Sequence, residues 1–223
     1  MLAYHSNGSV IDNAVVRYSK IGVGFVGSTS GSVKNSLIEQ TGDLPPKGNV
    51  HPSIYVTAGG TITIRDSVIH GVYDPNGVKD SDGGSAFYDT FAITFTNNYI
   101  YPGGIVYFVN VNGGTVSTNI NRGGSGAGID LVNGTRNIVF NNNYIEQVVG
   151  PGAVIASTQN LSFQNTIYVD NNQAQWIYCN GLNVFWWQNA NTNSGTTVTG
   201  DISVSAGLPQ YKTQCKLEGV SPP

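Results

Sequence analysis

Four aspartates lie close together in and just after a polar stretch with the sequence VYDPNGVKDSDGGS. Ca²⁺ prefers several oxygen ligands, which carboxylates and flexible backbone carbonyls supply. Asp74, Asp80 and Asp82 therefore form a candidate Ca²⁺ site, although their spacing is not that of an EF-hand. Two other interpretations stay open. Asp82 and Asp89 are candidate catalytic carboxylates for acid–base hydrolysis, and such a stretch is also typical of an ordinary solvated loop.

A second set of candidates is aromatic and lies in short segments where apolar and polar residues alternate. The candidate substrate-binding residues are Tyr55, Tyr88, Trp176 and Tyr178. Successive residues of a strand point to opposite faces, so inward aliphatic neighbours place Tyr55 and Asp130 outward. Rings beside a carboxylate suit sugars, which stack on rings and bond through hydroxyls. Asp130 is thus a third candidate catalytic residue. Trp176 has an alternative role, with Trp186 and Trp187, in capping the end of the fold.

The segments that carry these residues belong to a repeat. Six segments share an alternating apolar stretch, an Asn or Asp, one small or polar residue and a second apolar stretch. The Asn or Asp positions are Asn13, Asn35, Asp66, Asn97, Asn142 and Asn165. They are 22, 31, 31, 45 and 23 residues apart, and Asn119 divides the interval of 45 into 22 and 23. This period is typical of a solenoid coil with three short strands, and Asn tolerates the left-handed backbone of a tight corner.

The repeat predicts an all-β fold, a single-stranded parallel β-helix of about seven to eight coils of 22–31 residues. Coils are expected over residues 1–185 and a C-terminal capping segment over 186–223. The seven corner residues are expected to form one line along the stack, an asparagine ladder. Ile64 is expected to face inward, one coil from Phe95.

Two consecutive coils are nine residues longer than the period of 22. The extra residues lie around 41–53 and 72–85 and must leave the stack as loops. Because the coils are consecutive, the loops are expected to be neighbours on one side of the fold. Neighbouring insertions on a solenoid are a common place for function.

The Asn corner, the 22-residue coil and the phrase GIDLVNGTRNIVFNNNYIEQ resemble the pectate-lyase-like superfamily of right-handed parallel β-helices, over roughly residues 8 to 185. That superfamily includes polysaccharide lyases, polygalacturonase-type hydrolases, bacterial surface proteins and phage tailspikes. Gly128-Ile129-Asp130 followed by Asn137-Ile138 looks like the strand and turn that carry one catalytic Asp in the hydrolases. The adjacent Asp pair, the Gly-His-Gly and the Arg-Ile-Lys of that family are missing here, and no Arg or Lys lies in a lyase motif.

Composition excludes some classes of partner. The formal net charge is −3, and the ten Lys and Arg residues are scattered singly, which argues against nucleic acid. No apolar run approaches the roughly 20 residues of a membrane-spanning helix, so no membrane span is expected. Cys179 and Cys215 are either two buried thiols or a disulfide that ties down the C-terminal tail.

The predicted function is recognition of polysaccharide along the exposed side of the solenoid, at a cell or virion surface or otherwise outside the cell. The resemblance implies a bacterial capsule, lipopolysaccharide or cell-wall glycan as the partner, and it is compatible with a homotrimer. One alternative is a carbohydrate-active enzyme, either a lyase or a glycosidase of the tailspike depolymerase kind. A second alternative is a purely structural solenoid.

Overall fold

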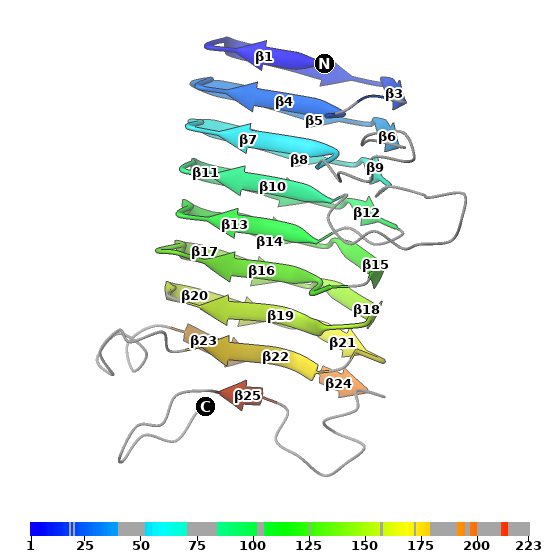
Figure 1. Cartoon of the computed structure of the whole chain (residues 1–223), viewed down its shortest axis with the longest axis vertical. Helices are drawn as coiled ribbons and strands as arrows, with labels where there is room; N and C mark the ends of the chain where they lie inside the picture. Colours follow the sequence, from blue (N-terminus) through cyan, green and yellow to red (C-terminus); the bar gives the residue numbers. More distant parts are fainter. Residues whose placement is uncertain are drawn as a thin grey trace, which may run out of the picture.

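The chain forms a stack of coils, and each coil adds one strand to each of three parallel sheets (Figure 1). The computed structural model describes residues 1–17, 19, 21–39, 52–70, 84–101, 105–124, 126–156, 158–171, 173–178, 191–194, 197–199 and 211–213. Two sheets contain eight strands and the third contains nine, so the described residues form eight coils and one further strand. The predicted parallel β-helix is confirmed.

We name the sheets A, B and C in the order in which each coil visits them. Sheet A consists of β1 (Leu2–Tyr4), β4 (Val23–Val26), β7 (Ile54–Thr57), β10 (Ser85–Tyr88), β13 (Val106–Val109), β16 (Ile129–Val132), β19 (Pro151–Ala156), β22 (Gln173–Tyr178) and β25 (Tyr211–Thr213). Sheet B consists of β2 (Asn7–Asp12), β5 (Ser30–Lys34), β8 (Thr61–Arg65), β11 (Phe91–Thr96), β14 (Asn112–Ser117), β17 (Arg136–Asn141), β20 (Gln159–Gln164) and β23 (Asn191–Ser194). Sheet C consists of β3 (Val15–Arg17), β6 (Leu37–Glu39), β9 (Val68–Ile69), β12 (Tyr99–Ile100), β15 (Ile120–Gly124), β18 (Tyr144–Val148), β21 (Ile167–Val169) and β24 (Thr197–Thr199).

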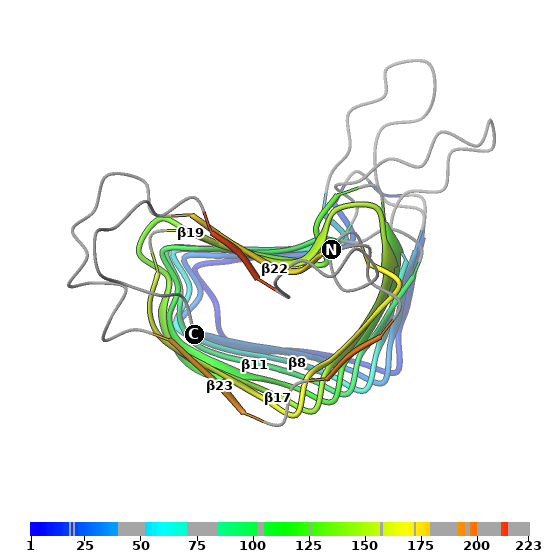
Figure 2. The same cartoon turned by 90° about the horizontal axis from the view of Figure 1, so that it is seen from below.

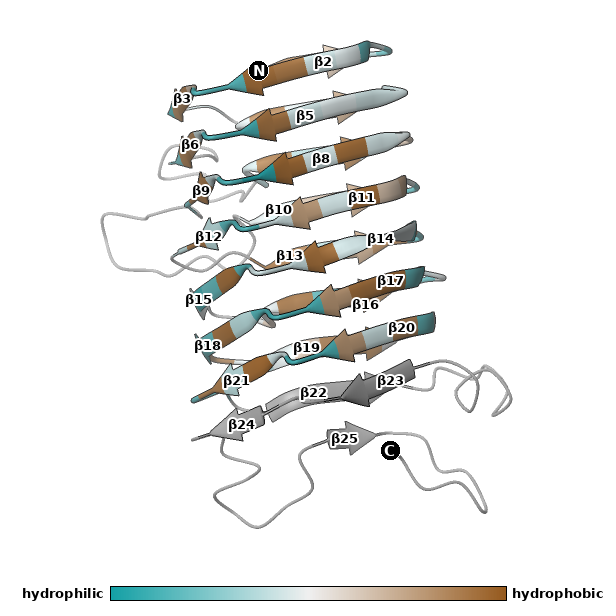
Figure 3. Ribbon diagram, turned by 180° about the vertical axis from the view of Figure 1, so that it is seen from behind, coloured by the Kyte–Doolittle hydropathy of each residue, from teal (hydrophilic) through white to brown (hydrophobic). Residues whose placement is uncertain are grey.

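The three sheets enclose a single core, which is visible when the molecule is viewed along the stack (Figure 2). Ile64 is fully buried and pairs in register with Val33 in the preceding coil and Phe95 in the next, as predicted. Aromatic rings continue this stack, and the Phe140 and Phe163 centroids are 4.6 Å apart. Figure 3 shows apolar bands recurring at matching positions of successive coils. Alternation within each strand therefore produces columns of like residues through the core.

The corner between sheets B and C has left-handed backbone in each of the seven coils in which the structure describes it. Seven residues occupy it with φ between 48° and 54°: Asn13, Asn35, Asp66, Asn97, Thr118, Asn142 and Asn165. The predicted corner line is confirmed at six positions and wrong for Asn119. Strand pairing aligns Ser117 with Thr96 and Asn141, so Thr118, the next residue, holds the seventh corner position.

Asn119 instead belongs to a buried row that lies one residue after the corner. The row contains Ser36, Ser67, Asn98, Asn119 and Asn143, all at most 4 % exposed. From Ser67 onward, the side-chain oxygen of each member accepts a hydrogen bond from the backbone amide of the member one coil before it. The four distances are 3.2, 3.2, 3.0 and 3.1 Å. The three Asn Nδ2 groups also donate to the backbone oxygens of Ile64, Phe95 and Val116, over 3.1, 2.8 and 2.8 Å. The asparagine ladder thus runs inside the stack and satisfies buried backbone groups of neighbouring coils.

We expect Thr118→Asn to stabilise the protein by about 1 kcal/mol. Thr118 has φ 54°, a conformation that is costly for a β-branched residue and that Asn adopts readily. Urea unfolding monitored by far-UV circular dichroism would show a higher midpoint. Thr115→Asn, at an exposed position of β14, the strand that ends just before Thr118, is the matched control and is expected to give no gain. If the urea midpoint of Thr118→Asn were equal to or lower than that of the unmodified protein, the backbone at this corner would not be strained by Thr118.

The predicted insertions fall largely on residues outside the described part of the chain, 40–51 and 71–83. These segments join β6 to β7 and β9 to β10, so both connect sheet C to sheet A in consecutive coils. Asp74, Asp80, Asp82, Cys179 and Cys215 also lie outside the described residues. At the C-terminal end, β23, β24 and β25 extend the three sheets beyond residue 185, where we expected the coils to end.

Candidate functional site

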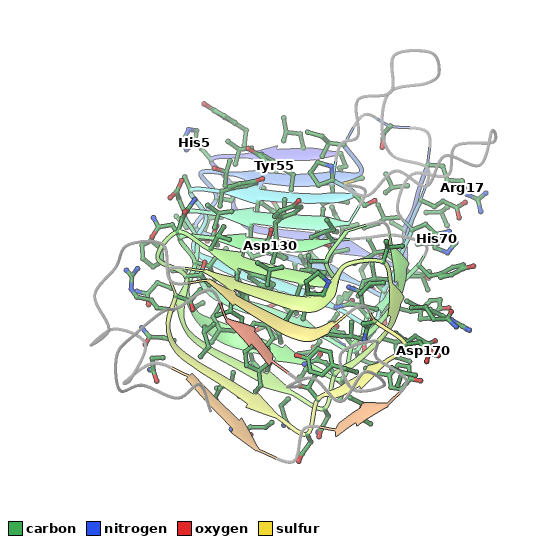
Figure 4. The ribbon with its side chains drawn as sticks, turned by 60° about the horizontal axis from the view of Figure 1, so that its bottom comes forward. His5, Arg17, Tyr55, His70, Asp130 and Asp170 are labelled. Carbon is green, nitrogen blue, oxygen red and sulfur yellow. The ribbon has the colours of Figure 1, made fainter. Side chains whose placement is uncertain are left out.

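The outer face of sheet A carries the predicted aromatic residues and Asp130. Register aligns Tyr55, Ala86, Tyr107, Asp130 and Val154 in one column that crosses five successive coils. Tyr55 and Asp130 project from the same face of the stack (Figure 4). Strand alternation produces this orientation, because the flanking residues of each strand are buried in the core.

Tyr88 lies in the neighbouring outward column, two residues further along the strand direction. Its ring centroid is 5.7 Å from that of Tyr55, and the two ring planes are inclined by 46°. Both rings are partly buried. Tyr55 and Tyr88 also belong to β7 and β10, the strands that follow the two insertions. The structure therefore brings two predicted substrate-binding rings together on the outer face of sheet A, with Tyr88 next to the corner between sheets A and B.

Sequence analysis missed Tyr107, which lies between Ala86 and Asp130 in the first column. Its signal is present in the sequence, because Tyr107 separates Val106 from Phe108 just as Tyr55 separates Ile54 from Val56. Both pairs of flanking residues are buried, and both tyrosines are partly exposed. Tyr107 completes a surface, which we call the sheet A face, formed by Tyr55, Tyr88, Tyr107 and Asp130.

Asp130 has unusual electrostatic surroundings for a surface residue. Its Oδ1 is buried and has no hydrogen-bond partner among the described residues. Burial raises the pKa of this carboxyl from 3.8 to about 6. The outward residues from β1 to β19 of sheet A include neither Lys nor Arg, so this stretch offers no cation to offset the buried charge. An unpaired, poorly solvated carboxylate on an outer face is typical of a binding or catalytic position.

We expect Asp130→Asn to stabilise the protein at neutral pH and to have little effect in acid. The folded pKa lies above the unfolded value of 3.8, so the ionised form destabilises the fold. This penalty is absent below about pH 4, grows as the pH rises to about 6 and is complete above that. After allowance for solvent screening, the gain at pH 7.5 is about 1 to 2 kcal/mol.

Urea unfolding of the Asp130→Asn variant at pH 4 and pH 7.5 measures this difference. Asp89→Asn is the matched control, because Asp89 is exposed and its carboxylate accepts a hydrogen bond from Asn110 Nδ2 over 2.8 Å. The control is expected to show no comparable pH-dependent gain. Equal effects of the two substitutions at pH 7.5 would argue against a buried charge at Asp130.

The remaining predicted site residues are placed differently. Asp89 occupies a left-handed corner between sheets A and B with φ 49°, two coils from Asp130 and three residues further along the strand direction. It therefore does not form a close carboxylate pair with Asp130. Trp176 and Tyr178 belong to β22 of sheet A, where Trp176 is in register with Val154. Their side chains lie outside the described part of the structure, as do Asp74, Asp80 and Asp82.

No metal cluster is found in the part of the chain that the structure describes, where no three His, Cys, Asp or Glu side chains group together. The candidate Ca²⁺ ligands lie in the segment 71–83, outside that part. The described residues form no helix that is long and apolar enough to cross a membrane.

The model of the family described as right handed beta helix region matches residues 46–198. The chain belongs to the right-handed β-helix family. No curated protein matches the sequence. Membership agrees with the three parallel sheets and assigns the coil a right-handed path, as the resemblance implied. A β-helix is a scaffold on which different activities occur, so the function must be argued from the sheet A face.

Proposed function

We propose that this right-handed β-helix protein binds an extended polysaccharide along the sheet A face, outside the cell or on a cell or virion surface. The observation that carries the proposal is the column in which Tyr55, Tyr107 and Asp130 face outward from nearby coils. Tyrosine rings offer apolar surface to the faces of sugar rings. The Asp130 carboxylate lies partly exposed on the same face and offers an acceptor for a sugar hydroxyl.

The length of the face supports a polymeric ligand over a single sugar. Adjacent coils present their outward residues about 4.8 Å apart, so the column from Tyr55 to Val154 spans about 19 Å. Individual stacking contacts on such an open face are weak, and several contacts to one chain reinforce one another. The two insertions connect sheet C to sheet A, so they enter this face at the start of β7 and β10. Loops at such a position often add contacts to a ligand.

A second candidate function is hydrolysis or elimination within the same glycan. The observation that favours it is the raised pKa of Asp130, about 6, which suits a general acid. Glycoside hydrolysis normally needs a second carboxylate within about 10 Å. The described outward residues of sheet A from β1 to β19 include no other Asp or Glu, so binding without cleavage is the better supported function.

We expect the double variant Tyr55→Ala/Tyr107→Ala to bind its glycan roughly 10-fold or more weakly, since each ring contributes about 0.5 to 1.5 kcal/mol. A panel of acidic and neutral bacterial glycans, with and without Ca²⁺, identifies the ligand, and titration calorimetry measures the affinity. The matched control is Phe91→Ala, which removes an aromatic ring that is 57 % exposed on sheet B. The control is expected to bind normally.

Two outcomes decide against the proposal. Unchanged affinity in the double variant would place the ligand elsewhere, and no binding across the panel would favour a purely structural solenoid. Asp130→Asn separates the two candidate functions. A binding protein keeps most of its affinity in this variant, whereas an enzyme that uses Asp130 loses turnover.

A further inference from the structure

The outer face of sheet C carries a second ordered column, which differs from the sheet A face in composition and in charge. Six successive coils contribute one outward residue each to a column that we call the charged column. In stack order these residues are Arg17, Glu39, His70, Tyr101, Arg122 and Glu146. Arg17 and His70 project from this side of the molecule (Figure 4). Along the stack, these six positions have a cation and an anion at each end and two aromatic rings in the middle, and the register continues beyond them with the uncharged Val169 and Thr199.

Contacts within the column hold its residues in place. Arg17 forms an ion pair with Glu39, and His70 Nδ1 lies 3.6 Å from the other oxygen of the Glu39 carboxylate. At the other end, Arg122 Nε lies 2.7 Å from Glu146 Oε1. The side chains of Arg17 and Arg122 are 49 % and 45 % exposed. Each guanidinium has five N–H donors, so both have donors left for a second carboxylate.

An apolar column runs beside the charged column on the same face. In the same six coils it consists of Val15, Leu37, Val68, Tyr99, Ile120 and Tyr144, and it continues with Ile167 and Thr197. Val15 is 62 % exposed and Ile120 is 41 % exposed. An exposed apolar strip flanked by charges resembles the composition of a protein interface.

We propose that sheet C docks against sheet C of a second copy of this chain whose stack runs in the opposite direction. A twofold axis parallel to the strands reverses the stack and leaves each column opposite itself. Arg17 then faces Glu146 of the second copy, Glu39 faces Arg122 and His70 faces Tyr101, and the symmetry makes each contact twice. The same operation places Val15 opposite Tyr144 and Leu37 opposite Ile120. Each Arg and Glu of the column thus meets an opposite charge.

Other arrangements of the same two faces lack this complementarity. A twofold axis along the stack that lies over the charged column puts Arg17 opposite Arg17 and Glu39 opposite Glu39, and one that lies between the two columns puts charged residues opposite apolar ones. In the antiparallel arrangement, a slip of one coil puts Arg17 opposite Arg122 in one direction and Glu39 opposite Glu146 in the other. Like charges in direct opposition disfavour an interface. The order of charges therefore selects one orientation and one register.

The size of the face indicates a weak, reversible dimer. Five coil steps of about 4.8 Å give a column about 24 Å long, and two columns with their side chains are about 15 Å wide. The buried area is then roughly 400 Å² on each copy, at the low end for specific complexes. We expect dissociation in the micromolar range or weaker, so sedimentation equilibrium at protein concentrations from about 10 µM to 1 mM is the appropriate measurement.

A charge-reversal pair tests the orientation directly. Glu39→Arg places a new guanidinium opposite Arg122 of the second copy, and Arg122→Glu places a new carboxylate opposite Glu39. We expect each variant alone to dimerise about 100-fold more weakly than the unmodified protein. In a mixture of the two variants, both reversed contacts become attractive again, and we expect heterodimers with near-original affinity. Restoration only on mixing is specific to the antiparallel register, because a stability defect would persist in the mixture.

Three results would overturn the proposal: an unmodified protein that stays monomeric at 1 mM, a trimer in place of a dimer, or single variants whose mixture does not recover association. Melting temperatures measured for each variant detect any loss of folding. Should a charge-reversal variant fail to fold, Ile120→Ser provides the second test, because Ile120 is 41 % exposed and lies opposite Leu37. We expect this variant to weaken the dimer several-fold, and an unchanged association constant would also count against the interface.

Discussion

Replacing Ile64 with Asp is expected to leave the protein unfolded at neutral pH. Ile64 is fully buried between Val33 and Phe95 of the neighbouring coils. An aspartate there loses the apolar contacts of the isoleucine and places a carboxylate where no described side chain offers a cation. The combined cost is more than about 5 kcal/mol, comparable to the whole stability of many domains. Far-UV circular dichroism and gel filtration would show lost β-structure and an expanded or aggregated chain.

Thr63→Asp is the matched control, since Thr63 precedes Ile64 on β8 and is partly exposed. The same new charge on the outer face is expected to change the free energy of unfolding by less than about 1 kcal/mol. A folded Ile64→Asp variant, or equal damage by both substitutions, would show that the inside and outside of β8 have been assigned wrongly.

Replacing Asn119 with Ala is expected to destabilise the protein by about 3 to 5 kcal/mol. Asn119 Oδ1 accepts hydrogen bonds from the amide and the Nδ2 of Asn98, both over 3.0 Å. Its Nδ2 donates to Phe95 O over 2.8 Å and to Asn143 Oδ1 over 3.0 Å. Alanine leaves these buried groups without their partner, and buried polar groups without partners are costly. Urea unfolding measures the loss.

Two further variants separate the buried row from the corner. Asn119→Ser is expected to lose less than Asn119→Ala, because serine oxygens accept the equivalent amide bonds at Ser36 and Ser67. Asn97→Ala removes an exposed corner residue and is expected to cost about 1 kcal/mol, mainly through its left-handed backbone. If Asn97→Ala and Asn119→Ala cost the same, both residues would belong to one line of corner residues, as the repeat alone suggested.

The fold was predictable because alternation and period act together. Alternation separates the buried residues of β8, such as Ile64, from their outward neighbours, and the 22-residue period sets which residues stack. The error at Asn119 arose because two adjacent positions both favour Asn. At Asn97-Asn98 and Asn142-Asn143 both are asparagine, and the second member of each pair is buried. Asn119 aligns with these second, buried members and not with the corner residues. The predicted register was therefore wrong by one residue in this coil.

The candidate site was only partly predictable. The outward position of Tyr55 and Asp130 follows from alternation alone, as does that of the overlooked Tyr107. The poor solvation of Asp130 does not, because it depends on the side chains that neighbouring coils place around it. The corner position of Asp89 was likewise hidden, since an acidic residue beside a polar segment has no sequence feature that separates a turn from a catalytic role.

Each described strand pairs only with its counterparts one coil before and one coil after, and the buried row from Ser36 to Asn143 is likewise a chain of links between adjacent coils. The molecule is therefore modular in length. Duplicating or deleting one whole coil of roughly 22 to 24 residues requires new contacts at only one junction. Such a change moves the two ends of the protein apart or together by about 4.8 Å and leaves the geometry within every other coil as it was. The length of an outer face can therefore change during evolution in fixed steps of one coil.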